Sequence, residues 1–241
     1  MRFAVCPANF GSWADPHLSV RAARAAETAG WDGFFVWDHL AWVWGPESAD
    51  PWVTLAAVAS ATDGLTLGTA VTPVPRRRPQ VLAQQLATLE RLNGGRVVLG
   101  AGLGGNKKEF TEFGEDFDPH RRAKLLDEGL GLIRNLWDGP IWVGGQSGPA
   151  LRRAARWDGW IPNSVEPHQL TMTAAGLAEK VRAIGRGDGF EVAFNGYSDQ
   201  GEDVRAYAAA GATWWLENLH DLRGDPDALV ARIEAGPPAA G

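Results

Sequence analysis

Short apolar runs alternate with amphipathic segments along nearly the whole chain. The runs carry apolar residues at consecutive positions, which is typical of β-strands that are covered on both faces. They predict eight strands, at Arg2–Cys6, Gly33–Trp37, Leu65–Val71, Arg96–Ala101, Ile141–Val143, Trp157–Pro162, Phe190–Phe194 and Ala212–Leu216.

The segments between these runs carry apolar residues at helical spacing. Four of them begin with an Asp-Pro pair, because Asp caps a first helical turn and Pro suits the first helical position. Glycines stand where several of them end, as helix C-termini favour. The predicted helices span 15–30, 50–64, 79–92, 118–136, 150–156, 167–184, 202–210 and 225–233.

Eight consecutive strand–helix pairs predict an α/β fold, a single parallel (β/α)8 barrel of the TIM type over residues 1–235. A doubly wound sheet is the alternative. It is disfavoured because it rarely needs eight consecutive units, and because no glycine-rich dinucleotide turn follows the first strand. The Pro-, Ala- and Gly-rich tail 236–241 is expected to be disordered.

Composition and charge narrow the functional classes. The chain has 241 residues, 45% of them hydrophobic, and a formal charge of −6, which offers no basic field for nucleic acid. Cys6 is the sole cysteine, so neither an intrachain disulfide nor a cysteine-rich zinc site can form. No signal peptide or membrane-spanning run is visible. We expect a cytoplasmic protein without nucleic-acid or membrane partners.

In a parallel barrel the active site lies where the strands end, so the residues that follow each strand are the candidates. They include Asp38, His39, Trp42, Trp44, Thr72, Gly102, Asn106, Asn195, Glu217 and Asn218. They show no catalytic triad or metal-ligand spacing, so no metal is predicted. A mouth with few ionisable groups favours an enzyme that binds a planar cofactor.

His39 is the candidate catalytic residue, since it follows a strand and titrates near neutral pH. Trp42, Trp44 and Glu217 are the candidate substrate-pocket residues, although an internal structural ion pair is the favoured alternative for Glu217. Glu109 and Glu112 are expected on a solvated helix face. The three consecutive arginines 76–78 are expected in a solvated loop.

The segment from Pro140 to Pro162 places a glycine pair between a strand and a helix. Free backbone N–H groups at a helix start can bind a phosphate or carboxylate, so Gly144, Gly145, Gln146 and Ser147 form a candidate anion site. An ordinary strand-to-helix turn is the alternative.

Several segments together resemble the bacterial luciferase-like flavin-dependent oxidoreductases, which include FMN monooxygenases and oxidoreductases that use coenzyme F420. The matching segments are GWDGFFVWDHL, LTLGTAVTPVPRRRP, LNGGRVVLGAGLGGNKKEFTEFGE, RAKLLDEGLGLIRNLWDG, PIWVGGQSGPALRRAARWDGWIP and AGATWWLENL. No single motif is diagnostic, but their order and spacing are specific. The resemblance implies a TIM-type barrel that binds a flavin at the strand ends.

The resemblance also implies roles for individual residues. Ala70, Val71 and Thr72 match a segment that runs along the isoalloxazine ring and often holds a non-proline cis peptide. The turn Gly144–Ser147 matches the phosphate-binding turn, and His39 matches a histidine near the reactive ring in F420-dependent relatives. Gly102 and Asn106 are expected to contact the cofactor as well.

Two departures from the family pattern stand out. Relatives carry a few dozen more residues between the fourth helix and the fifth strand, whereas Asp138-Gly139 runs directly into Pro140. Gly105 stands where a sugar-phosphate-oxidising F420 relative has a catalytic glutamate, which weakens the transfer of that reaction.

The sequence therefore predicts a flavin-dependent monooxygenase that uses reduced FMN on a small organic substrate. FMN is preferred because no Glu stands at position 105 and no Lys/Arg cluster is evident for an acidic cofactor tail. The alternatives are an F420-dependent oxidoreductase, a non-catalytic flavin-binding protein, and a hydrolase or lyase that uses Asp38 and Glu217 as a carboxylate pair. A homodimer is expected, and a separate flavin reductase is a further expected partner.

Overall fold

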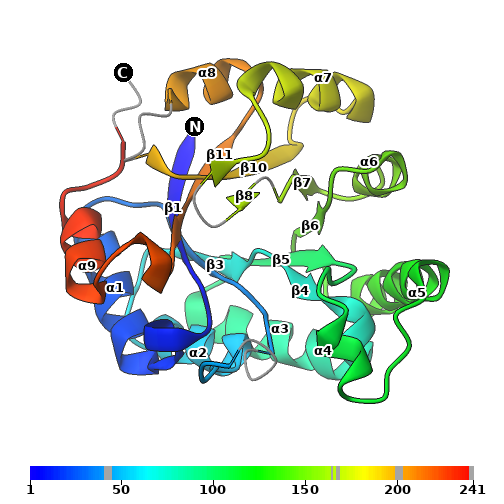
Figure 1. The fold of residues 1–241 in the computed structure, drawn as a ribbon, viewed down its shortest axis with the longest axis horizontal. Helices are drawn as coiled ribbons and strands as arrows, with labels where there is room; N and C mark the ends of the chain where they lie inside the picture. Colours follow the sequence, from blue (N-terminus) through cyan, green and yellow to red (C-terminus); the bar gives the residue numbers. More distant parts are fainter. Residues whose placement is uncertain (41–44, 164, 167–168, 199–202, 239–241) are drawn as a thin grey trace.

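The chain folds into a closed parallel barrel surrounded by helices, as predicted (Figure 1). The computed structural model describes residues 1–40, 45–163, 165–166, 169–198 and 203–238. The barrel strands are β1 (Arg2–Pro7), β2 (Gly33–Val36), β3 (Thr66–Thr69) continued by β4 (Thr72–Pro73), β5 (Val97–Gly102), β6 (Ile141–Gly144), β7 (Gly159–Ile161), β10 (Glu191–Gly196) and β11 (Trp214–Leu219). They pair in the order β3-β2-β1-β11-β10-β7-β6-β5-β4, and a β3–β5 pairing closes the ring.

The helices follow the predicted pattern closely. Their bounds are α1 (Pro16–Thr28), α2 (Pro51–Ala59), α3 (Pro79–Asn93), α4 (Lys108–Thr111), α5 (Pro119–Leu136), α6 (Gly148–Ala154), α7 (Ala174–Ile184), α8 (Val204–Ala209) and α9 (Pro226–Glu234). The four predicted Asp caps are confirmed, since each accepts a backbone N–H of the first turn. Within the described ranges, no helix combines the length and apolar character needed to cross a membrane.

The prediction of a helix over 167–184 is wrong in its first part. α7 begins only at Ala174, because the Thr173 side chain accepts from Gly176 N and caps the helix there. Gln169–Leu170 instead forms β9, which pairs antiparallel with β8 (Val165–Glu166), and residues 167–168 lie outside the described part of the chain. The short connection before the fifth barrel strand is confirmed, since residues 137–140 alone join α5 to β6.

The third predicted strand is interrupted where the resemblance suggested. β3 ends at Thr69, the Ala70–Val71 peptide bond is cis, and β4 then pairs with the end of β5. In the tail, residues 236–238 are described and partly buried, and the Gly236 carbonyl accepts a hydrogen bond from Arg232. Residues 239–241 lie outside the described part.

An aromatic layer fills the inside of the barrel. Phe35 and Trp142 stack with ring centroids 5.6 Å apart, and Trp214 packs against both. Glycines on neighbouring strands make the space: a Cβ on Gly68 would lie 2.6 Å from Phe35, and one on Gly159 would lie 2.4 Å from Trp142. Much of the tryptophan excess is therefore core packing.

Candidate active site

The barrel brings most of the predicted site residues to one rim, because all parallel strands end on the same side. His39 follows β2, Ala70 and Val71 lie between β3 and β4, and Gly102 ends β5. The turn 144–147 begins at the end of β6, and Glu217 lies near the end of β11. Trp42 and Trp44 fall outside the described residues.

His39, whose side chain is 31% exposed, contacts a buried carboxylate that the sequence reasoning missed. Its Nδ1 lies 2.8 Å from Oε1 of Glu109, a residue of α4 that is only 1% exposed. The same carboxylate oxygen accepts from Leu40 N, and Oε2 lies 2.7 Å from Nη1 of Arg76. The expectation of a solvated face is therefore wrong for Glu109, although Glu112 is exposed as predicted.

Glu109 stays ionised in this setting. Its burial opposes the charge, but the hydrogen bond and the charge of His39, together with Arg76 and the Leu40 N–H, outweigh it and lower the pKa of Glu109. An ionised carboxylate can only accept, so Nδ1 of His39 carries a proton. In the neutral ring, Nε2 is then the basic nitrogen.

Asp38, the residue before His39, forms a cluster with two arginines. Arg77 donates to Asp38 Oδ2 through Nε at 3.0 Å and Nη2 at 2.8 Å, while Arg76 donates to the Asp38 carbonyl at 2.7 Å. The Arg76 side chain is 6% exposed. The prediction of a solvated basic loop is therefore wrong for Arg76 and Arg77, because both arginines neutralise buried carboxylates. Arg78 is exposed.

The backbone of His39 is held from the other side by Asn9, which follows β1. Asn9 Nδ2 donates to the His39 carbonyl at 2.8 Å, and Asn9 Oδ1 accepts from His39 N at 3.0 Å. Asn9 was visible in the sequence as a polar residue after the first strand. Its partner could not be identified there.

A small apolar shelf lies between β3 and β4. Ala70 and Val71 are partly exposed, whereas Thr69 and Thr72 on either side are buried and bonded to each other through their hydroxyls at 3.1 Å. A Cβ on Gly102 would lie 2.6 Å from Val71 Cγ2, and one on Gly144 would lie 3.1 Å from Val71 Cγ1. Both glycines thus let Val71 sit at the rim, and the shelf suits the face of a planar ring.

The turn after β6 has the expected form. Gly145 has a φ of +112°, Ser147 caps α6 by accepting from Ala150 N, and Gln146 Nε2 donates to the Asn163 carbonyl at 2.9 Å. The Gly145 N–H is already bonded to the Ile161 carbonyl, so it is not available to a ligand. Asn106 lies across the rim, where its Oδ1 accepts from Lys108 N.

Two cations flank this turn, and the sequence did not indicate them. Lys180 of α7 donates to the Gln146 carbonyl at 3.4 Å. Arg152 Nη1 lies 3.4 Å from the position a Cβ on Gly148 would take. The turn is therefore suited to an anionic group.

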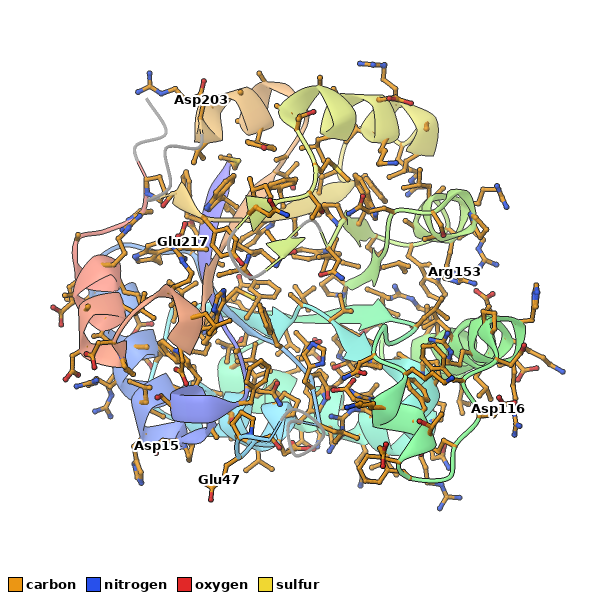
Figure 2. All side chains as sticks on the ribbon, viewed as in Figure 1. Asp15, Glu47, Asp116, Arg153, Asp203 and Glu217 are labelled. Atoms are coloured by element: carbon orange, nitrogen blue, oxygen red, sulfur yellow. The ribbon has the colours of Figure 1, made fainter. Side chains whose placement is uncertain are left out.

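Glu217 has a structural partner. It is 1% exposed, accepts from Trp215 Nε1 at 2.9 Å, and pairs with Arg223 at 3.1 Å. Figure 2 shows it inside the molecule, whereas Asp15, Asp116 and Asp203 lie at the periphery. Because Asp38 and Glu217 each pair with their own arginines, the structure gives no support to a shared acid–base pair.

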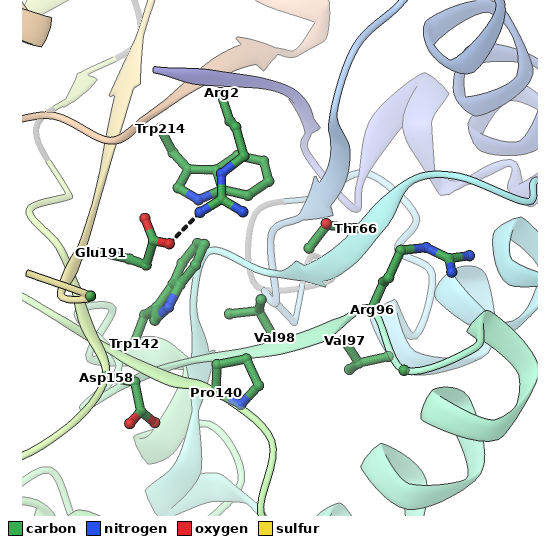
Figure 3. A pocket seen from close by; sticks show the side chains of 12 residues that line it. Arg2, Thr66, Arg96, Val97, Val98, Pro140, Trp142, Asp158, Glu191 and Trp214 are labelled. Carbon is green, nitrogen blue, oxygen red and sulfur yellow. Dashed lines mark hydrogen bonds and ion pairs between the residues drawn. The ribbon is translucent and has the colours of Figure 1, made fainter.

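A separate cavity of about 330 Å³ lies at the opposite end of the barrel (Figure 3). Its walls come from strand beginnings, including Arg2, Thr66, Val97 and Trp214. Arg2 is paired there with Glu191 and stacks on Trp214. This end is remote from the strand C-termini, where parallel barrels carry their catalytic residues.

The chain matches known proteins over most of its length. The family model described as luciferase-like monooxygenase matches residues 5–140. An F420-dependent hydroxymycolic acid dehydrogenase from Mycobacterium tuberculosis is 34% identical to this chain. The match covers 69% of this chain and 54% of the dehydrogenase, so this chain spans about half the length of that relative.

Two solved structures show the same fold. The F420-dependent tetrahydromethanopterin reductase from Methanopyrus kandleri aligns with a TM-score of 0.74 at 16% identity, covering 97% of this chain and 96% of that one. The oxygenating constituent of 3,6-diketocamphane monooxygenase from Pseudomonas putida, in complex with FMN, aligns with a TM-score of 0.62 at 16% identity, covering 76% of this chain and 61% of that one. The chain therefore belongs to the luciferase-like monooxygenase family of oxidoreductases.

Proposed function

We propose that this chain is an F420-dependent oxidoreductase that interconverts a small organic alcohol and its carbonyl compound, with His39 as the group that holds or accepts the proton. The observation that carries the proposal is the contact between the partly exposed His39 and the buried Glu109 at the barrel rim. A histidine with its Nδ1 proton bound to a carboxylate is held in the tautomer whose Nε2 is basic, which is the tautomer that general acid–base catalysis through Nε2 requires.

The deazaflavin ring would lie on the shelf of Ala70 and Val71, beside Gly102 and Asn106. Its phosphate would lie at the turn Gly144–Ser147, with Lys180 and Arg152 supplying positive charge. When bound, the cofactor supplies the hydride chemistry that the side chains lack. His39 accepts or returns the hydroxyl proton, and Glu109 compensates the charge that His39 gains.

The proposal departs from the sequence-based preference for FMN for two reasons. The apparent lack of cations for an acidic tail is offset by Lys180, which the fold brings to the turn, and by Arg152 of the helix that follows it. A relative whose name states F420 dependence also shares 34% identity with this chain. An FMN monooxygenase is the second candidate, favoured by the family model and by the FMN-bound neighbour of the same fold.

Titration of the purified protein with F420 and with FMN, each oxidised and reduced, tests the proposal. We expect saturable perturbation of the F420 absorbance, with FMN binding weaker by about tenfold or more. His39→Ala should still bind F420 but lose alcohol oxidation. Tighter FMN binding with oxygen-dependent turnover would establish the second candidate, and binding of a cofactor without any turnover would favour a non-catalytic flavin-binding protein.

A homodimer stays a prediction, and so does a separate reductase.

A further inference from the structure

Trp37 occupies the floor of the barrel mouth, two residues before His39. Its partly buried side chain packs on the aromatic layer inside the barrel, as do Ala70 and Val71. Among the described residues, these three are the partly buried apolar side chains that pack on that inner cluster. If the shelf of Ala70 and Val71 takes the cofactor ring, the indole of Trp37 is the remaining member of these three described residues that can offer an apolar surface beside it.

The Trp37 ring is held in one orientation by its surroundings. Its Nε1–H donates to Oδ1 of the fully buried Asn218 at 3.3 Å, and Asn218 also accepts from Asn195 at 3.4 Å. The rings of Phe10 and His220 lie 6.0 Å and 5.8 Å from the indole. A side chain fixed in this way can bind a ligand without a further loss of its own conformational freedom.

His39 lies at the edge of this surface. Its ring centroid is 6.0 Å from that of Trp37, and the two planes are inclined at 69°. A small molecule stacked on the indole would therefore have its edge within reach of the imidazole.

The charges behind the mouth select against an ionised ligand. Asp38 and Glu109 are paired with Arg76 and Arg77, and Glu217 is paired with Arg223. An ionised substrate moved from water onto the apolar indole would lose hydration without gaining a counter-charge from these groups.

We propose that Trp37 is a specificity-determining residue, which forms the floor of a subsite for small neutral alcohols and carbonyl compounds and orients their oxygen toward His39. This inference rests on the proposed function, since it names the substrate class of the same site. Asn218 is a positioning residue, because it acts through the orientation of Trp37.

Fluorine NMR of the protein labelled with 5-fluorotryptophan tests the subsite without turnover. The Trp37 signal is assigned by its loss in Trp37→Phe, and Trp157, which packs on the outside of the barrel, is assigned by Trp157→Phe as the control. Cyclohexanone and cyclohexanecarboxylate are the neutral and charged probes, each added with and without F420. We expect cyclohexanone to shift the Trp37 signal saturably, and cyclohexanecarboxylate at the same concentration to leave it in place.

Calorimetry adds the energetic readout. Trp37→Leu should bind cyclohexanone about tenfold more weakly, which corresponds to about 55 Å² of lost apolar contact. Trp37→Phe should stay within about threefold, since it keeps an aromatic floor. Asn218→Ala should broaden or split the Trp37 signal while the Trp157 signal stays unchanged.

The two proposals fail in different ways. The subsite proposal would be overturned, even if F420 binds, by either of two results. The Trp37 signal could fail to shift with cyclohexanone both with and without F420, or it could shift equally with cyclohexanone and cyclohexanecarboxylate. A Trp37 signal that responds in a protein that binds neither cofactor would support the subsite and overturn the proposed function.

Discussion

Replacement of Glu109 by Gln tests whether the pair behind His39 is as strong as its geometry indicates. In the native protein the carboxylate binds His39 and the Leu40 N–H through one oxygen and Arg76 through the other. The amide oxygen of Gln can keep the hydrogen bonds to His39 and to the Leu40 N–H. The amide N–H2 group then faces the Arg76 guanidinium, and because both groups are hydrogen-bond donors they cannot bond to each other. Glu109→Gln should therefore lose the Arg76 contact and retain the packing.

The expected loss of stability depends on the contacts that Arg76 retains in the variant. Removing one partner of a buried ion pair commonly costs about 3–5 kcal/mol, because the other charge is left alone. Arg76 still bonds to Asp38, so we expect a smaller loss of about 2–3 kcal/mol in the free energy of unfolding at pH 7. For a chain of this size that corresponds to a fall in Tm of roughly 5–10 °C.

The loss should also depend on pH. The pKa of Glu109 is lowered in the folded protein, so its charge stabilises the fold above the usual value of 4.5 and ceases to do so as the pH falls through the lower folded value. Urea unfolding from pH 7 to pH 4 should show the difference between native protein and Glu109→Gln narrowing below about pH 4.5. Glu112→Gln, an exposed change three residues away, should stay within about 0.5 kcal/mol throughout. Equal effects of the two variants, or a difference independent of pH, would refute the reasoning.

Other variants probe the packing and the outer ion pairs. Gly100→Ala should destabilise the protein by about 3 kcal/mol or more, because its Cβ would lie 1.8 Å from the Thr69 carbonyl oxygen. Gly131→Ala, on the open side of α5, should stabilise it by about 0.5–1 kcal/mol, and thermal unfolding compares the two. The pKa of Asp127 is lowered by its hydrogen bond to Arg153. Asp127→Asn should therefore cost about 0.5–1 kcal/mol at pH 7, since the carboxylate is partly exposed, and the loss in urea unfolding should shrink below about pH 4; a loss that persists at pH 3 would contradict this.

The fold was predictable from the sequence because its signals are local. Each Asp-Pro cap acts within one helical turn, and each strand shows its burial in a few consecutive residues. The failure of the helix prediction at 169–173 has the same origin. Leu170 and Leu177 fit a helical spacing, while the pairing of β8 with β9 and the cap at Thr173 are not visible in that spacing.

The site was predictable only in part, because its contacts join distant positions. His39 could be chosen from its place after a strand, whereas its partner Glu109 lies 70 positions away among charged residues that read as a solvated face. Arg76 and Arg77 likewise find Asp38 only after β2 and β3 pair. The signal that could have found Glu109 is its place beside Phe110, which is buried in the same short helix.

The charges of this cluster account for the environment of His39. Three carboxylates, Asp38, Glu109 and the more distant Asp50, lie beside two arginines, Arg76 and Arg77. Protonation of His39 then adds one positive charge, which the Glu109 oxygen at 2.8 Å meets directly. Arg76 holds the Glu109 carboxylate in place whether His39 is neutral or protonated. The sequence provided all of these residue types, but the charged cluster around His39 forms only when the barrel closes.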